Sequence, residues 1–288
     1  MRVLELFSGL GGWRLALQAR GTVVGAYDVS EAANATYELN HGDRPQAREL
    51  AALPLAELAE HRADAWLLSP PCQPFCRMGR HRGLEDRRSR AFRHLMELFP
   101  QAPPDHLVLE NVDGFLGSDA HALLAERLRA HGMGQLDLQV CPSRFGLPNQ
   151  RPRVFVVASR QPLVVQAPPD LPSRPLSAFL DPEEDQTLYL PSELLARHRP
   201  GLDLVRPTEY RSACFIGGYG RRFVGSGSFL HTERGVRRFS PAEVARLLGL
   251  PAGFRFPESV AREVRYRLLG NGLSIPPATW ALNHLAGR

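Results

Sequence analysis

The chain has 288 residues, of which 43% are hydrophobic and 23% charged, as is usual for a globular protein with one large domain or one large and one small domain. The net charge is +5, and all 35 side chains of the Lys+Arg count are arginine, which favours bidentate contacts to phosphate, although a solvated basic surface would have the same composition. No apolar run is long enough to span a membrane and no leader peptide precedes the first strand-like run, so we expect a cytoplasmic protein with reduced thiols.

Strand-like and helix-like stretches alternate through the first 160 residues. We expect strands at 3–7, 22–27, 65–68, 106–109, 135–140 and 154–158, and helices at 13–20, 31–40, 53–61, 89–99 and 119–130. This alternation predicts an α/β fold with a doubly wound, mostly parallel sheet.

The composition changes after Arg160. Residues 161–207 are rich in proline and show little periodicity, which indicates a smaller, irregular domain. Further helices are expected at 240–248, 258–268 and 277–285, and the first has the start signal Ser-Pro-Ala-Glu at residues 240–243. We therefore expect a large domain at 1–160, a small target-recognition domain at 161–239, and helices at 240–288 that pack back on the large domain.

The stretch from Leu67 to Phe75 presents one thiol rigidly. Three prolines flank Cys72, and proline fixes its own φ and biases the preceding residue to extended geometry. Ligands of open α/β sheets bind at the carboxyl edge of the strands, so a thiol held there is a candidate nucleophile. A buried structural cysteine is the alternative. The spacing of Cys72 and Cys76 does not suit a zinc site, and we expect no metal.

A glycine-rich turn, Phe7-Ser8-Gly9-Leu10-Gly11-Gly12, follows the first strand. Such a turn lets a cofactor approach the main chain, and Asp28, which closes the second strand, can accept hydrogen bonds from ribose hydroxyls. The turn by itself fits a nicotinamide enzyme or a methyltransferase, and Asp28 by itself fits a turn or helix-capping acid.

Charged residues follow two later strands. Glu110 ends the strand after the one that bears Cys72, so its carboxyl group is expected in the same cleft, where it could act as an acid; alone, it would fit a surface acid. Arg151 and Arg153 are two apart on an extended segment, and we expect that one faces the cleft and the other supports the loop, unless both belong to a solvated edge. An arginine cluster beside the nucleophile is expected to grip phosphates rather than form a solvated face; it comprises Arg77, Arg80, Arg82, Arg87, Arg88, Arg90 and Arg93.

The order of these motifs, closed by Leu269-Gly270-Asn271-Gly272, resembles that of the cytosine-C5 methyltransferases. The resemblance covers residues 2–160 and about 236–286. Within the family the chain looks most like the tRNA-methylating branch, historically named as the second DNA methyltransferase, because Cys214-Phe215-Ile216 and Gly218-Tyr219-Gly220 are similar to that branch's signature. The chain departs from the family pattern at Asn149, Ile216 and Gly272.

The resemblance implies a Rossmann-like methyltransferase fold, S-adenosyl-L-methionine as cofactor and S-adenosyl-L-homocysteine as product. It implies cofactor contacts from Phe7, Leu10, Gly11, Gly12, Asp28, Leu50, Ser69 and Asn271. It also implies catalytic roles for Cys72, Glu110, Arg151 and Arg153, and nucleic-acid contacts from Arg77, Arg80, Arg82, Arg87, Arg88, Cys214, Phe215 and Tyr219.

The function implied is methylation of cytosine C5 in RNA, in the anticodon loop of tRNA(Asp), through a covalent Cys72–C6 adduct. The first alternative is a DNA cytosine-C5 methyltransferase of a restriction-modification or orphan type. The segment of about fifty residues between Arg160 and Cys214 looks short for reading a duplex site. The second alternative is a non-catalytic nucleic-acid-binding relative. We expect tRNA or DNA as partner, and neither a membrane nor an obligate protein partner.

Overall fold

A computed structural model describes residues 1–75, 83–183 and 185–285. The chain divides into two compact units. Unit 1 comprises Met1–Val140, Pro152–Pro168 and Pro277–Arg288, and unit 2 comprises Cys141–Arg151 and Pro169–Pro276. This division differs from the expected domains, because residues 240–276 fall in the smaller unit and the boundary near the last strand passes between Arg151 and Arg153.

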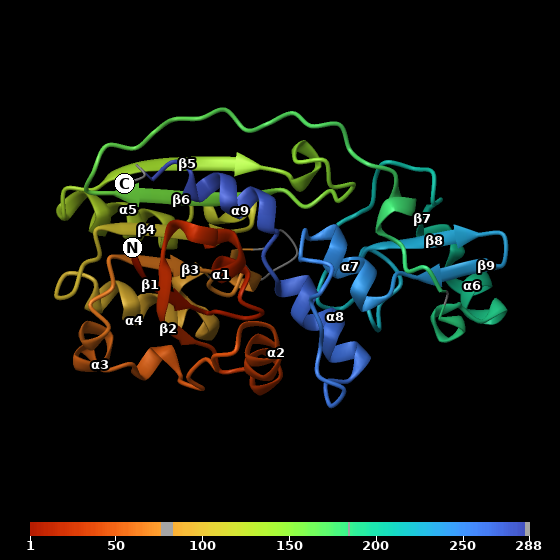
Figure 1. Cartoon of the computed structure of the whole chain (residues 1–288), viewed down its shortest axis with the longest axis horizontal. Helices are drawn as coiled ribbons and strands as arrows, with labels where there is room; N and C mark the ends of the chain where they lie inside the picture. Colours follow the sequence, from red (N-terminus) through yellow and green to blue (C-terminus); the bar gives the residue numbers. More distant parts are fainter. Residues whose placement is uncertain (76–82, 184, 286–288) are drawn as a thin grey trace. The chain divides into compact units, whose positions relative to one another are not determined.

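Unit 1 is built on a six-stranded sheet (Figure 1). Its strands lie in the order β2-β1-β3-β4-β6-β5, with β2, β1, β3 and β4 parallel and β6 antiparallel to both of its neighbours. The bounds are β1 (Arg2–Leu6), β2 (Thr22–Tyr27), β3 (Ala65–Leu68), β4 (His106–Asn111), β5 (Gly134–Val140) and β6 (Arg153–Ser159). The predicted doubly wound α/β fold with a largely parallel sheet is confirmed.

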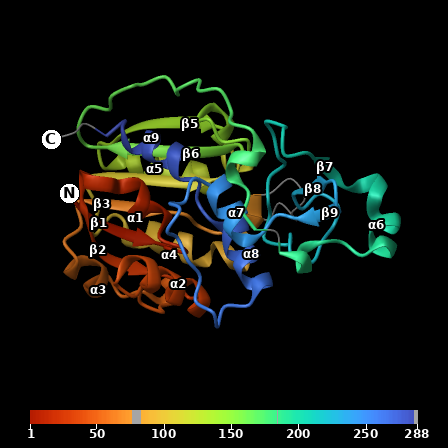
Figure 2. The same ribbon diagram turned by 45° about the vertical axis from the view of Figure 1, so that its right-hand side comes forward.

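Helices cover both faces of this sheet because its strands are apolar on both sides. One core joins the side chains of Leu4, Leu6 and Trp66 to the helices α3 (Leu55–Glu60), α4 (Arg90–Leu98) and α5 (Asp119–Ala130). The opposite face carries α1 (Gly12–Leu17), α2 (Glu31–His41) and α9 (Ile275–Leu282). Figures 1 and 2 both show α9 beside β6, although the two are far apart in sequence. Among the described residues, no helix is long and apolar enough to cross a membrane.

Unit 2 has a three-stranded sheet in the order β7-β8-β9. The strands of this sheet are β7 (Asp203–Val205), β8 (Ser228–Thr232) and β9 (Gly235–Arg238). The helices of unit 2 are α6 (Ser192–His198), α7 (Pro241–Leu247) and α8 (Arg262–Asn271). The predicted start of α7 is confirmed, because Ser240 and Glu243 form a reciprocal capping box. The predicted start of α8 at residue 258 was wrong. The amide of Val260 donates to the carbonyl of Pro257 in a turn, and the helix begins four residues later than expected.

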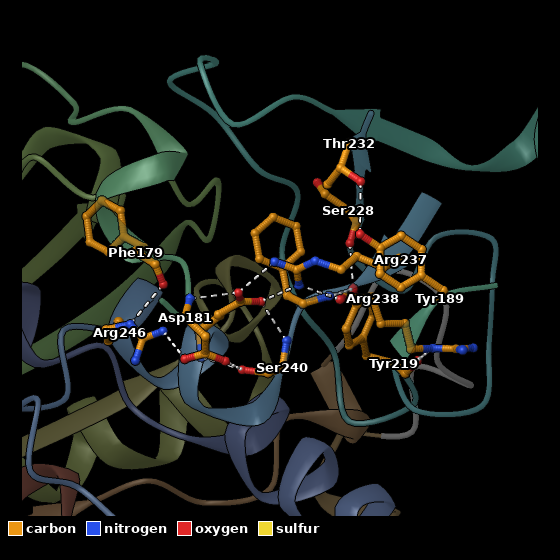
Figure 3. A network of polar contacts seen from close by, with 12 residues as sticks. Phe179, Asp181, Tyr189, Tyr219, Ser228, Thr232, Arg237, Arg238, Ser240 and Arg246 are labelled. Carbon is orange, nitrogen blue, oxygen red and sulfur yellow. Dashed lines mark hydrogen bonds and ion pairs between the residues drawn. The ribbon is translucent and has the colours of Figure 1, made fainter. Parts of the chain in front are cut away.

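A buried ion pair holds the core of unit 2 together (Figure 3). Both guanidinium nitrogens Nη1 and Nη2 of Arg237 lie 2.8 Å from the carboxylate oxygens of Glu243, and the residues are 2% and 0% exposed. The same carboxylate accepts hydrogen bonds from the amides of Asp181 and Ser240. A single carboxylate therefore ties the end of β9 and the start of α7 to the loop that contains Asp181.

Candidate active site

The site in unit 1 lies where the strand order reverses. The chain leaves β1 towards β2 on one side and later enters β3 on the other, so the carboxyl ends of β1 and β3 form the switch point at which open α/β sheets bind ligands. The glycine-rich turn follows β1, and the stretch that bears Cys72 follows β3. Strand β4, next to β3, ends in Glu110 and Asn111. The topology thus brings three of the sequence motifs to one edge of one sheet.

The glycine-rich turn has a tightly bent main chain. Phe7 has a φ of 60° and Gly9 a φ of 52°, both in the left-handed region. Such a φ costs a non-glycine residue about 1–2 kcal/mol, and backbone strain of this kind concentrates at functional sites. A Cβ added to Gly9 would have Phe7 O, 4.0 Å away, as its nearest contact, so the main chain borders open space there.

Asp28 joins this turn to the second helix. Its Oδ2 accepts the amide of Gly9 at 2.9 Å, and its Oδ1 accepts the amide of Ser30 at 2.8 Å. Burial raises the pKa of the Asp28 carboxyl group above its usual value, and these two main-chain hydrogen bonds oppose the rise. Asn34, which is fully buried, donates from Nδ2 to the carbonyl of Asp28 and fixes its position.

The residues around the turn fit a nucleoside cofactor. The hydroxyl of Ser8 is buried and has no hydrogen-bond partner among the described residues, and Gly9 leaves room for a ligand beside it. Ser69 is half-buried and accepts a hydrogen bond from the indole Nε1 of Trp13. Val29, which follows Asp28, is apolar and 63% exposed, and it was not among the predicted site residues. An exposed apolar side chain beside a candidate ribose-binding acid suggests a contact with a ligand, but the sequence does not reveal this exposure.

The side chains of the other expected cofactor residues are less accessible. Leu10 is 5% exposed, and Leu50 is 3% exposed within the core. These two residues can therefore offer mainly their main chain to a ligand. Asn271 is exposed at the end of α8, in unit 2, and its role as a cofactor contact stays a prediction.

Cys72 lies on a strap, residues 70–75, that β4 and the turn after it hold in place. The buried amide of Asn111 donates from Nδ2 to the carbonyl of Pro70 at 3.1 Å. The strap ends in a short 3₁₀ turn, Gln73–Phe75, and a Cβ on Gly114 would lie 2.2 Å from the main-chain oxygen of Phe75. Asn111 and Gly114 are positioning residues that the sequence analysis did not single out, and their signal was the run Glu-Asn-Val-Asp-Gly that ends the strand.

Glu110 and Arg153 meet at the same edge of the sheet. Because β6 runs antiparallel to β4, the first residues of β6 lie beside the last residues of β4. Arg153 Nε is 3.1 Å from Glu110 Oε1, and the two side chains are 14% and 10% exposed. The largely desolvated guanidinium stabilises the carboxylate and fixes its orientation.

Arg151 occupies a different environment, inside unit 2. It is 2% exposed, and its guanidinium donates to the carbonyl oxygens of Phe215, Gly270 and Gly272. It also lies 3.4 Å from the sulfur of Cys214. The guanidinium of Arg151 thus joins two segments of unit 2, as expected of the arginine that supports the loop, and its catalytic role stays a prediction.

Two of the expected nucleic-acid contacts are core residues. Phe215 is 2% and Tyr219 1% exposed, and their rings pack edge-to-face on each other. The Tyr219 hydroxyl donates to the carbonyl of Ser228 and accepts the amide of Phe239. Both rings thus belong to the core of unit 2, and a direct contact with nucleic acid stays a prediction.

The other expected contacts remain on the surface or outside the described residues. Cys214 is half-buried. Arg87 and Arg88 are exposed, and Arg88 is paired with Asp86 at 2.6 Å. Arg77, Arg80 and Arg82 lie outside the described residues.

A half-buried thiol, an acid paired with a guanidinium and a bent glycine-rich turn at the edge of a doubly wound sheet are typical of group-transfer enzymes with a nucleoside cofactor. Residues 1–199 match the family described as C-5 cytosine-specific DNA methylase. The chain belongs to this family: it is a cytosine-C5 methyltransferase, and S-adenosyl-L-methionine is its methyl donor.

The relatives extend the match over the whole chain. A tRNA (cytosine(38)-C(5))-methyltransferase of Rattus norvegicus is 31% identical in an alignment that covers 96% of each chain. A DNA (cytosine-5)-methyltransferase of Dictyostelium discoideum is 26% identical and covers 96% of this chain and 91% of its own. The crystal structure of the S. pombe Dnmt2 methyltransferase superposes with a TM-score of 0.88 at 28% identity, covering 98% of each chain.

Proposed function

We propose that the protein methylates C5 of a cytosine in the anticodon loop of a tRNA, with tRNA(Asp) as the first candidate. The match to relatives named as tRNA methyltransferases runs over nearly the full length of both chains, unit 2 included. A loop nucleotide is also easier to extrude than a paired one, which suits a site that must reach C5 and C6 of the base.

The mechanism rests on one observation: the Cys72 strap and the Glu110–Arg153 pair lie at the same edge of the sheet. We assign Cys72 as the nucleophile: its thiolate adds to C6 of the cytosine and makes C5 nucleophilic. Bound S-adenosylmethionine supplies the methyl group that C5 takes up. Loss of the C5 proton then expels the Cys72 thiolate and restores the aromatic base.

Glu110 is assigned to N3 of the same base. Its carboxyl group protonates N3 or forms a hydrogen bond with it, which stabilises the adduct at C6. Arg153, 3.1 Å away, holds the carboxyl group in place and can reach the pyrimidine carbonyl or a phosphate. Asn111 acts indirectly, by holding the Pro70 carbonyl and with it the strap.

The cofactor is assigned to the crevice between β1 and β3. Asp28 retains lone pairs on both carboxylate oxygens for the ribose hydroxyls, beside the main-chain amides that it already accepts. The exposed side chain of Val29 offers an apolar surface for the adenine ring. Phe7 and Ser69 border the same crevice from the ends of β1 and β3.

DNA is the second candidate substrate, favoured by the name of the Dictyostelium relative. Against duplex DNA, the chain before Cys214 in unit 2 is short and largely irregular, and α6 and the three-residue strand β7 are the α-helix and strand among its described residues. A non-catalytic role is the third reading, and the ordered strap, acid and turn speak against it.

The test is transfer of labelled methyl from S-adenosylmethionine to a tRNA(Asp) transcript, total tRNA and duplex DNA. We expect label in tRNA with the wild-type protein and none with Cys72→Ala, whereas Cys141→Ala, a thiol of unit 2, serves as a matched control that keeps its activity. An RNA carrying 5-fluorocytosine should trap a denaturation-resistant adduct only when Cys72 is present. Label in DNA alone would overturn the RNA assignment, and full transfer by Cys72→Ala would overturn the nucleophile.

A further inference from the structure

A buried carboxyl group that the proposed mechanism does not use lies beneath the glycine-rich turn. Glu5 is on β1, two residues before Phe7, and is 0% exposed. Its Oε2 accepts a hydrogen bond from the Tyr37 hydroxyl at 2.9 Å. Its Oε1 is shielded from solvent and has no hydrogen-bond partner among the described residues.

Tyr37 connects this carboxyl group to the turn. A Cβ added to Gly11 would lie 2.9 Å from Tyr37 Cε2 and 2.2 Å from His41 Nε2, so both rings of α2 pack tightly on the turn. His41 Nε2 also lies 3.3 Å from the carbonyl of Leu10. Tyr37 therefore contacts both the Glu5 carboxyl group and the turn.

The charges around Glu5 come from α1, α2 and the loop after α2. Arg14 of α1 lies 5.8 Å above the Tyr37 ring, and its charge is offset by Asp43 at 2.6 Å. Burial lowers the pKa of His41 below its usual value, so this imidazole is neutral at pH 7. No other charged group is recorded as acting on the Glu5 carboxyl group within the described part of the chain.

Glu5 changes its charge near neutral pH. Burial raises the pKa of its carboxyl group to about 7, against the Tyr37 hydrogen bond and the main-chain amides of Arg14 and Trp13, which favour the charged form. An acid that titrates in this range responds to any cation placed near it.

We propose that Glu5 allows the cofactor site to distinguish S-adenosylmethionine from S-adenosylhomocysteine by charge. The donor carries a sulfonium cation and the product a neutral thioether, and only the cation is stabilised by a carboxylate behind the turn. Donor binding therefore releases the Glu5 proton to solvent, and exchange of donor for product lets Glu5 take a proton back. The inference rests on the placement of the cofactor at the turn, proposed above.

The test is calorimetric binding of both ligands at pH 6 and pH 8, on either side of the Glu5 pKa of about 7. The amino groups of the ligands titrate as well, so the decisive quantity is the difference between wild type and Glu5→Gln. We expect the preference for donor over product to rise roughly fivefold from pH 6 to pH 8 in the wild type beyond any rise in the variant, because Glu5 changes from mostly protonated to mostly charged over this range. Titrations at pH 7 in two buffers of different ionisation enthalpy should show protons released by the donor that the product does not release.

A second variant covers the case in which Glu5→Gln fails to fold. Tyr37→Phe removes the hydrogen bond that favours the charged carboxylate, so the rise in donor preference should move to higher pH. His41→Gln is the control for the neighbouring imidazole and should leave the rise unchanged.

Two outcomes separate the inference from the proposed site. Equal pH dependence in wild type and Glu5→Gln, or an unmoved transition in Tyr37→Phe, overturns the role of Glu5 alone. Undiminished binding of both ligands by Asp28→Ala would instead show that the cofactor is not bound at the turn.

Discussion

At the scale of the residue, the two acids near the glycine-rich turn, Asp28 and Glu5, differ in the hydrogen bonds that their carboxyl groups accept. Asp28 accepts two main-chain amides, which stabilise its charged form against the effect of burial. Glu5 accepts a hydrogen bond from the Tyr37 hydroxyl, and the main-chain amides of Arg14 and Trp13 oppose the effect of its complete burial only in part. The buried charge of Glu5 is therefore costly to the folded state, whereas its protonated form is not.

This cost predicts a pH-dependent stability. The folded-state pKa of Glu5, about 7, lies above the ordinary value of 4.5, so its contribution to stability is present below 4.5 and is lost as the pH rises through 7. Complete loss corresponds to roughly 3 kcal/mol, at about 1.4 kcal/mol for each pKa unit.

The measurement is urea unfolding at pH 5 and pH 8. The free energy of unfolding of the wild type should fall between these values relative to that of Glu5→Gln, whose amide does not titrate. Parallel curves for the two proteins would contradict the assignment of this pKa to Glu5.

At the scale of the element, the position of the thiol depends on the strap at residues 70–75 and on the turn after β4. Asn111 holds the start of the strap through the Pro70 carbonyl, and Gly114 allows the main chain of Phe75 to approach closely. The ring of Phe75 packs edge-to-face on Phe115, with centroids 5.2 Å apart. Both ends of the strap are thus fixed by residues that follow β4.

Gly114→Ala should therefore misplace Cys72 without affecting the cofactor turn. A Cβ 2.2 Å from the Phe75 oxygen forces the strap to move, and a displacement of about 1 Å at a reacting group can lower a rate on the order of a hundredfold. We expect the rate of single-turnover methyl transfer to fall roughly tenfold or more, while the dissociation constant of S-adenosylmethionine stays unchanged.

Gly134→Ala provides the control in the same unit, because a Cβ there meets its nearest atoms at 3.8 Å, an ordinary contact. A Gly114→Ala protein with the wild-type rate would show that the strap tolerates the shift.

At the scale of the whole molecule, each unit has its own core. Unit 1 buries the residues between its sheet and helices, and unit 2 buries an aromatic cluster together with the Arg237–Glu243 pair. Arg151 belongs to the second of these sets and Arg153 to the first, so the segment that joins them serves two separate purposes.

The buried pair in unit 2 predicts a large cost for breaking one partner. Glu243→Gln leaves the Arg237 guanidinium buried without its counter-charge, which typically costs about 3–5 kcal/mol. The double variant Arg237→Met with Glu243→Leu should recover much of this loss, because it removes both charges.

Urea unfolding of the three proteins measures the effect. Glu263→Gln is the matched control, since its pair with Arg221 is exposed and should contribute less than about 1 kcal/mol. A Glu243→Gln protein as stable as this control would contradict the role given to the buried pair.

The sequence predicted much of unit 1 because its signals are local. Strands β2 and β3 and helix α5 have the expected bounds, since alternating apolar runs, caps and turn residues act within a few positions of the chain. Unit 2 was less predictable. Its strands are short, its loops are rich in proline, and α8 begins after Ala261, which makes no side-chain cap hydrogen bond.

The class of chemistry is predictable from the sequence, because a glycine-rich turn, a thiol between prolines and an acid after a strand follow one another in a characteristic order. Which of these residues meet depends on the three-dimensional fold. Arg153 reaches Glu110 because β6 runs antiparallel to β4, and Phe215 and Tyr219 turn inward because unit 2 packs around them. Strand order, strand direction and burial depend on contacts between residues far apart in the chain, and no local pattern encodes them.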